Sequence, residues 1–87
     1  MKIGEYFVKN DYITQQALDD ALELQKQNKD KRLGELLVDM GAVLKEDLSK
    51  YVFNFMENVE NANLSDAADW LDQDDVDALF DKYRPEH

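Results

Sequence analysis

The sequence contains no cysteine, and it has only one proline, three glycines and one histidine. The lack of cysteine excludes disulfide bonds, thiolate metal ligands and a cysteine nucleophile. His87 is the single histidine, so no histidine-based metal site or acid–base pair is expected. No apolar run approaches the about eighteen residues of a membrane-spanning helix, and no basic start precedes an apolar stretch. These features predict a cytoplasmic protein that is not an enzyme, needs no cofactor and does not insert into a membrane.

Basic residues are scarce towards the C-terminus. Of the net charge of −10, residues 1–56 contribute −2, from eight basic and ten acidic residues. Residues 57–87 contribute −8, from two basic and ten acidic residues. A field of this sign repels nucleic acid and anionic lipid and favours a protein surface with Lys or Arg. The alternative is an acidic segment that only keeps a small protein soluble.

The first part of the chain contains an internal repeat with a period of thirty residues. Residues 2–25 (KIGEYFVKNDYITQQALDDALELQ) align without a gap with residues 32–55 (RLGELLVDMGAVLKEDLSKYVFNF). Glycine, charged and apolar positions match in one register: Lys2 with Arg32, Ile3 with Leu33, Gly4 with Gly34, Phe7 with Leu37, Val8 with Val38, Ile13 with Val43, Leu18 with Leu48, and Leu22 with Val52. Such matches indicate a tandem pair of one structural unit.

Each unit is predicted to form a short helix and a longer one, because its apolar residues follow helical spacing. Asn10 and Asp11 favour a turn in the first unit, and Gly41 should end the short helix of the second. Thr14 is predicted to cap the first long helix, whose apolar side includes Leu22. Residues 1–56 are therefore expected to form an all-α bundle of two helix-turn-helix repeats, with four helices in total.

Residues 57–66 (ENVENANLSD) have little to bury and are predicted to form a linker. The following acidic tail, residues 67–87, is expected to contain one or two short helices. A helical turn is indicated around Trp70 and Leu71, while Asp72 can cap a helix that Pro85 closes. The apolar residues of that helix lie at i, i+3, i+4 and i+7: Val76, Leu79, Phe80 and Tyr83. Because so short a helix is marginal alone, this stripe must dock on the chain's own bundle or on a partner.

The two units resemble the paired motif of the GspE N-terminal (MshEN) family, the N-terminal domain of type II secretion and type IV pilus assembly ATPases. The pattern R-L-G-x-x-[LVI]-[LVI]-x-x-G-[LVI]-[LVI], with later Leu and Gln positions, covers residues 2–55. No ATPase follows in this chain, so the resemblance implies the domain standing alone. Some members bind cyclic di-GMP, and the matching positions here are Lys2, Gly4, Gln25, Arg32, Gly34 and Gly41. The chain departs from the pattern at Lys2, at Asp11 in place of glycine, and at Phe55 in place of glutamine.

Residues 71–80 (LDQDDVDALF) resemble the N-terminal segment of the flagellar switch protein FliM, written S-Q-x-[ED]-I-D-A-L-[LF]. That peptide becomes helical on the phosphorylated receiver protein CheY. The resemblance implies that Val76, Leu79 and Phe80 fill an apolar groove and that Asp75 and Asp77 meet basic residues at its edge. Tyr83 extends the same stripe.

Together these features predict a bacterial adaptor in motility or signalling. Its acidic helix would bind a partner with a basic-rimmed apolar groove, such as a CheY-like receiver. One alternative is a cyclic di-GMP sensor that uses both repeats. Another is a purely structural interaction domain whose tail packs on its own bundle. Trp70 is either a recognition anchor or a residue that packs locally.

Overall fold

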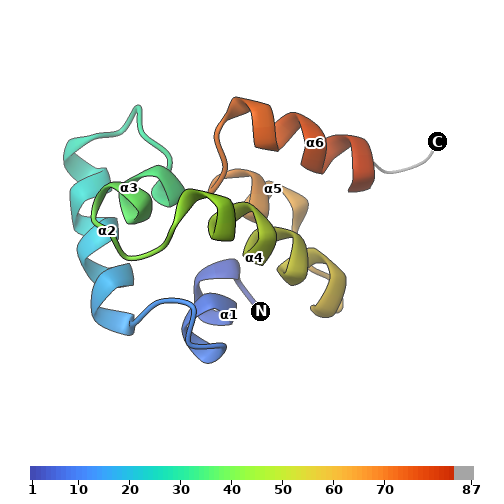
Figure 1. The fold of residues 1–87 in the computed structure, drawn as a ribbon, viewed down its shortest axis with the longest axis horizontal. Coiled ribbons are helices and arrows are strands. Elements are labelled where there is room, and N and C mark those ends of the chain that lie inside the picture. The colour runs from blue at the N-terminus through green and yellow to red at the C-terminus, as the bar shows by residue number, and fades with distance from the viewer. Residues whose placement is uncertain (84–87) are drawn as a thin grey trace.

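We describe residues 1–83 in a computed structural model; residues 84–87, which include Pro85 and His87, lie outside the described part. Residues 1–83 form six helices and no strand, which confirms the all-α prediction (Figure 1). The helices are α1 (Ile3–Lys9), α2 (Gln15–Gln27), α3 (Leu33–Asp39), α4 (Lys45–Asn58), α5 (Leu64–Ala68) and α6 (Gln73–Tyr83). Over these residues, no helix combines the length and the apolar character needed to cross a bilayer.

The internal repeat appears directly in the helix positions. Helices α1 and α3 begin and end thirty residues apart, and α2 and α4 begin thirty residues apart. After each short helix the chain turns through a left-handed residue, Asp11 with φ 60° and Gly41 with φ 77°. The amide that follows each of these residues donates a hydrogen bond of 2.9 Å, from Tyr12 to Phe7 and from Ala42 to Leu37. Asp11 therefore adopts the backbone conformation that glycine has in the second unit, a conformation that Asp tolerates better than most residues.

The two units pack reciprocally around one core. Helix α1 packs against α4, and α2 packs against α3, so each short helix contacts the long helix of the other unit (Figure 1). The largest fully buried side chains come from both units and from the C-terminal helices: Phe7, Phe55, Ile3, Leu37, Leu71, Leu79 and Val52. Aromatic rings tie the units together, because Tyr12 of the first unit stacks on Tyr51 of α4 with ring centroids 3.7 Å apart. The bundle is thus a single hydrophobic core rather than two separate ones.

The two long helices are not equally covered. Val52 of α4 is fully buried, whereas its repeat equivalent Leu22 of α2 is 43% exposed, so the prediction that Leu22 lies on the core side is wrong. Further along, α4 carries Phe55 and Met56 where α2 carries the polar Gln25 and Lys26. Helix α5 packs against α4. The more apolar face of α4 gives the C-terminal helices a surface on which burial is favourable, and the charged face of α2 does not.

The segment predicted to be a linker is largely built into the fold. Helix α4 continues to Asn58 and α5 begins at Leu64, so only residues 59–63 lie between helices. Val59 and Ala62 within this connection are half-buried against the core. Trp70 and Leu71, which follow α5, are both buried. The C-terminal helices therefore form part of the same globule as the repeats.

Replacing Leu44 with Thr is expected to stabilise the protein. Leu44 occupies the N-cap of α4, is 62% exposed and makes no capping hydrogen bond, whereas its equivalent Thr14 accepts one of 3.0 Å from the Ala17 amide. Leu44→Thr should raise the free energy of unfolding by about 1 kcal/mol. In a domain of this size, that change raises Tm by roughly 4–8 °C in thermal denaturation.

The matched control is Thr14→Ala, which should lower the free energy of unfolding by a similar amount, about 1 kcal/mol. An unchanged Tm for Leu44→Thr alongside a lowered Tm for Thr14→Ala would show that the α4 N-terminus is satisfied in another way.

Candidate functional site

Trp70 lies against both repeat glycines. A Cβ atom on Gly34 would come within 1.7 Å of the Trp70 carbonyl oxygen, so only glycine lets the backbones approach this closely. A Cβ atom on Gly4 would lie 3.6 Å from the Trp70 ring and 3.2 Å from Leu18. The indole also packs against the Phe7 ring, at a centroid distance of 4.7 Å. The two glycines that mark the repeat thus accommodate the segment after α5.

The acidic side chains of α5 and its C-cap lie beside the basic residues that precede α1 and α3. Asp66 accepts a hydrogen bond of 2.8 Å from the Ile3 amide, which satisfies an otherwise free N–H at the start of α1. Asp69 lies 3.9 Å from the Arg32 guanidinium, and both acids line a shallow hollow with Lys2. Carboxylates from within the chain therefore lie where an anionic ligand of Lys2 and Arg32 would be placed.

The residues matched to the cyclic di-GMP motif are only partly brought together. Gln25 and Arg32 line one polar hollow with Asp66, Asp69 and Trp70, and Gly4 and Gly34 lie under Trp70. Gly41 is at the opposite end of α3, with open space around it. A dianionic dinucleotide at these positions would meet two carboxylates and would have to displace a buried Trp70.

The start of α6 is fixed by Asp72, as predicted. Its carboxylate accepts a hydrogen bond of 3.1 Å from the Asp75 amide and forms an ion pair of 3.2 Å with Lys45 of α4. The capping hydrogen bond and Lys45 together hold the pKa of Asp72 below its usual value, against a smaller opposing effect of burial. Val76 and Leu79 follow and are buried in the core. The apolar stripe of α6 thus docks on the chain's own bundle along much of its length.

The C-terminal end of α6 is held by Glu57 of α4. The Tyr83 hydroxyl donates a hydrogen bond to this carboxylate, and Lys82 forms an ion pair of 2.9 Å with it. These contacts lower the pKa of Glu57, while burial and the Glu57 hydrogen bond raise that of Tyr83. The Tyr83 ring also meets Phe53 edge-on at 6.1 Å. Side chains of α4 therefore hold α6 at both ends, a role that the α6 sequence alone does not reveal.

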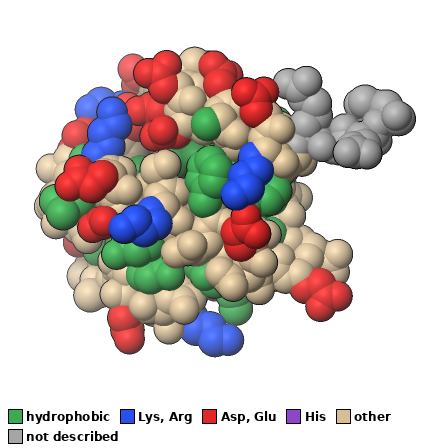
Figure 2. All heavy atoms as spheres, turned by 45° about the vertical axis from the view of Figure 1, so that its right-hand side comes forward, with side chains coloured by type: hydrophobic (Ala, Val, Ile, Leu, Met, Phe, Trp, Pro, Cys, Tyr) green, Lys and Arg blue, Asp and Glu red, His purple; other side chains and the backbone are tan. Residues whose placement is uncertain are grey.

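The predicted partner-binding residues lie on three sides of α6. Val76 and Leu79 are buried, and Asp75 and Tyr83 are half-buried. Asp77 is exposed, with its carboxylate accepting a hydrogen bond from Gln73, and Phe80 is 37% exposed. Figure 2 shows acidic side chains along the upper edge of the molecule, where α6 lies. We call the outward surface formed by Asp74, Asp77 and Phe80 the acidic α6 face.

Replacing Gly34 with Ala should displace Trp70. The added methyl group would overlap the Trp70 carbonyl and lie 2.8 Å from a Leu48 methyl carbon. Overpacking against backbone should lower the free energy of unfolding by about 2–3 kcal/mol in urea titrations. The fluorescence of Trp70, the chain's only tryptophan, should shift to the red.

Gly4→Ala is the matched control, since its nearest neighbour is a flexible Leu18 side chain. There the better helix propensity of Ala offsets the tight contact, and the change in stability should stay within about 1 kcal/mol. Equal effects of both substitutions would contradict a specific approach of Trp70 to Gly34.

The docking of α6 should respond to pH in two opposite ways. The lowered pKa of Asp72 means that its stabilisation is complete above its unfolded pKa of about 3.9 and is lost as the pH falls through its folded pKa. Burial and the neighbouring Asp72 charge raise the pKa of Asp75 above its unfolded value, so the ionised form of Asp75 lowers the stability of the fold. This loss is removed as the pH falls through the folded pKa of Asp75, which lies above that of Asp72. Urea unfolding of Asp72→Asn and Asp75→Asn between about pH 7 and pH 3 should isolate the two effects.

Asp75→Asn should be more stable than the parent near pH 7 and should lose this advantage as the pH falls. Asp72→Asn keeps a capping residue but should show a smaller loss of stability below about pH 3.9. Parallel curves for the parent and both variants would contradict these assignments.

No protein-family model matches this chain, and neither a curated protein nor a solved structure shows a significant match to it. The resemblances to the GspE N-terminal family and to the FliM segment therefore stay predictions. In residues 1–83, no group of His, Cys, Asp or Glu is arranged to hold a metal ion.

Proposed function

We propose that this protein is a non-enzymatic adaptor that presents α6 as a preformed acidic helix to a basic surface of another protein. The observation that carries the proposal is the acidic α6 face, where Phe80 stays 37% exposed on a folded helix beside Asp77. An exposed aromatic side chain flanked by charge is a common anchor of protein interfaces. Residues 1–83 contain no cysteine, an intrinsically strong nucleophile, and no histidine, the side chain used most often as a general base.

Recognition with α6 still docked is favoured over recognition of a released helix. Releasing α6 would expose Val76 and Leu79, at a cost of about 1.5–3 kcal/mol for each side chain. It would also break the contacts of Asp72 with Lys45 and of Tyr83 with Glu57. Binding at the acidic α6 face avoids this cost, because Asp77 and Phe80 already face solvent. The partner then needs a shallow apolar contact with basic residues around it.

A CheY-like receiver domain is the first partner to test, because residues 71–80 resemble the FliM segment that binds one. The whole chain should bind such a receiver in calorimetric titrations, and a phosphoryl mimic on the receiver should strengthen binding. Phe80→Ala should weaken binding at least about tenfold, because the loss of an aromatic anchor costs about 1.4 kcal/mol or more of binding free energy. Asp77→Asn should weaken it by about two- to fivefold and reduce its salt dependence, as expected for an exposed charge.

Two matched controls lie on α2, away from α6. Leu24→Ala removes a side chain of similar exposure, at 38%. Asp20→Asn changes a carboxylate that accepts an i,i+4 hydrogen bond from glutamine, as Asp77 does. Both controls should bind as the parent does. Absence of binding with and without the phosphoryl mimic would rule out a receiver partner, and equal losses in the controls would rule out the acidic α6 face.

A further inference from the structure

A small cavity of about 220 Å³ lies where α3, α4 and the start of α6 meet. Its apolar lining comes from three elements: Val38 of α3, Leu48 of α4, and Trp70, which precedes α6. The volume is below the roughly 300–1,000 Å³ of sites that take drug-sized ligands or nucleotides. It suits a single side chain with an apolar stem.

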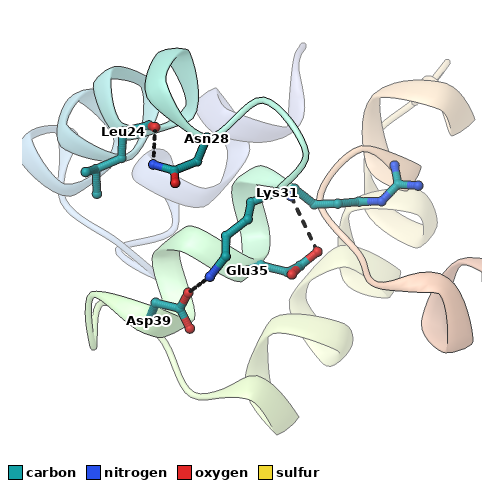
Figure 3. A network of polar contacts seen from close by, with 6 residues as sticks. Leu24, Asn28, Lys31, Glu35 and Asp39 are labelled. Atoms are coloured by element: carbon teal, nitrogen blue, oxygen red, sulfur yellow. Dashed lines mark hydrogen bonds and ion pairs between the residues drawn. The ribbon is translucent and has the colours of Figure 1, made fainter.

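Charged residues surround the opening, with an excess of carboxylates. The rim carries four carboxylates and two ammonium groups: Glu35, Asp39, Asp72, Asp75, Lys31 and Lys45. Both lysines already form ion pairs, Lys31 with Asp39 at 2.9 Å and Lys45 with Asp72 at 3.2 Å. Figure 3 shows the Lys31 side chain running along α3 to Asp39, while the Glu35 carboxylate points away from this pair and accepts a hydrogen bond of 3.4 Å from the Arg32 amide. The rim therefore has a local charge of −2 after its own cations are counted.

Asp75 is the rim residue with most to gain from another cation. It is half-buried, and in residues 1–83 Lys45 forms its direct ion pair with Asp72 rather than with Asp75, whose charge it offsets only from a longer distance. Burial and the adjacent Asp72 carboxylate raise the pKa of Asp75, so its charged form is destabilised where it stands. A cation that enters the cavity would lie beside this carboxylate and would stabilise its ionised form.

We propose that this cavity receives the side chain of a lysine or arginine from the partner protein. The aliphatic stem would lie over Val38, Leu48 and the Trp70 indole, and the cationic group would meet Asp75 and Glu35. This inference rests on the proposed function and names a specific anchor within it. Asp75 and Phe80 lie on opposite flanks of the buried stripe of α6, so a partner that contacts both would span the outward side of the helix.

The cavity can be tested without knowing the partner, by titrating the full chain with capped amino acids. The probes are N-acetyl-lysine methylamide and N-acetyl-arginine methylamide, with N-acetyl-norleucine methylamide as a neutral control of similar stem length. The cationic probes should change Trp70 fluorescence and shift the amide NMR signals of residues 70–75. Dissociation constants on the order of millimolar are expected, since one side chain makes few contacts.

Asp75→Asn should weaken binding of the cationic probes at least about fivefold, whereas Asp20→Asn on α2 should leave it unchanged. Well-dispersed NMR spectra of both variants would show that they fold. Equal binding of norleucine, or no effect of Asp75→Asn, would overturn the proposal. Free lysine that binds more tightly than capped lysine would indicate a small-molecule site and would overturn it as well.

Probe binding at the cavity and receiver binding at the acidic α6 face can each fail without the other. Receiver binding that depends on Phe80 but not on Asp75, with no probe binding, would leave the adaptor role intact and reject the cavity. Probe binding that depends on Asp75, with no receiver binding, would support the cavity and reject a receiver as the partner.

Discussion

The approach of the Trp70 backbone to Gly34 is the contact on which the rest of this fold depends. It places the segment after α5 directly on α3, where any side chain larger than hydrogen would overlap the Trp70 carbonyl. The indole then reaches Gly4 and Phe7 of the first unit, so one residue touches both repeats. Leu71 is buried beside it, and the start of α6 follows at a fixed position. The other contacts of the C-terminal helices, such as that of Asp66 with the Ile3 amide and those of Lys45 and Glu57 with α6, lie on either side of this point.

A second constraint is the difference between the repeats. The duplicated units share helix positions and turn geometry, but α4 kept apolar residues where α2 carries Gln25 and Lys26. Burying a charged face without partners is unfavourable, so the C-terminal helices cover the second unit and leave Leu22 in solvent. The asymmetry of the pair therefore decides which side of the molecule carries α6 and its acidic surface.

The position of α6 also limits which of its residues the proposed partner would contact. Its two central apolar residues contribute to the core, and Glu57 and Lys45 hold its ends. The parts of α6 that such a partner would reach are the exposed flank with Phe80 and the half-buried carboxylate of Asp75, which lines the same cavity as Trp70. Because the two central apolar residues of α6 are buried and only its flanks are accessible, this arrangement suits a partner that binds the folded, docked helix rather than one that requires the helix to unfold and refold.

Much of the secondary structure followed from the sequence by itself, because the signals are local. The thirty-residue period, the cap at Thr14, the turn at Gly41 and the cap at Asp72 each depend on neighbouring backbone groups. Only the tertiary structure decided which surface each amphipathic helix would face. Leu22 and Leu79 carry the same apolar character, yet one is exposed and the other is buried, because burial depends on which distant segment covers the site. The same dependence on distant contacts places Glu57 beside Tyr83 and Trp70 on Gly34, and no local pattern encodes either pairing.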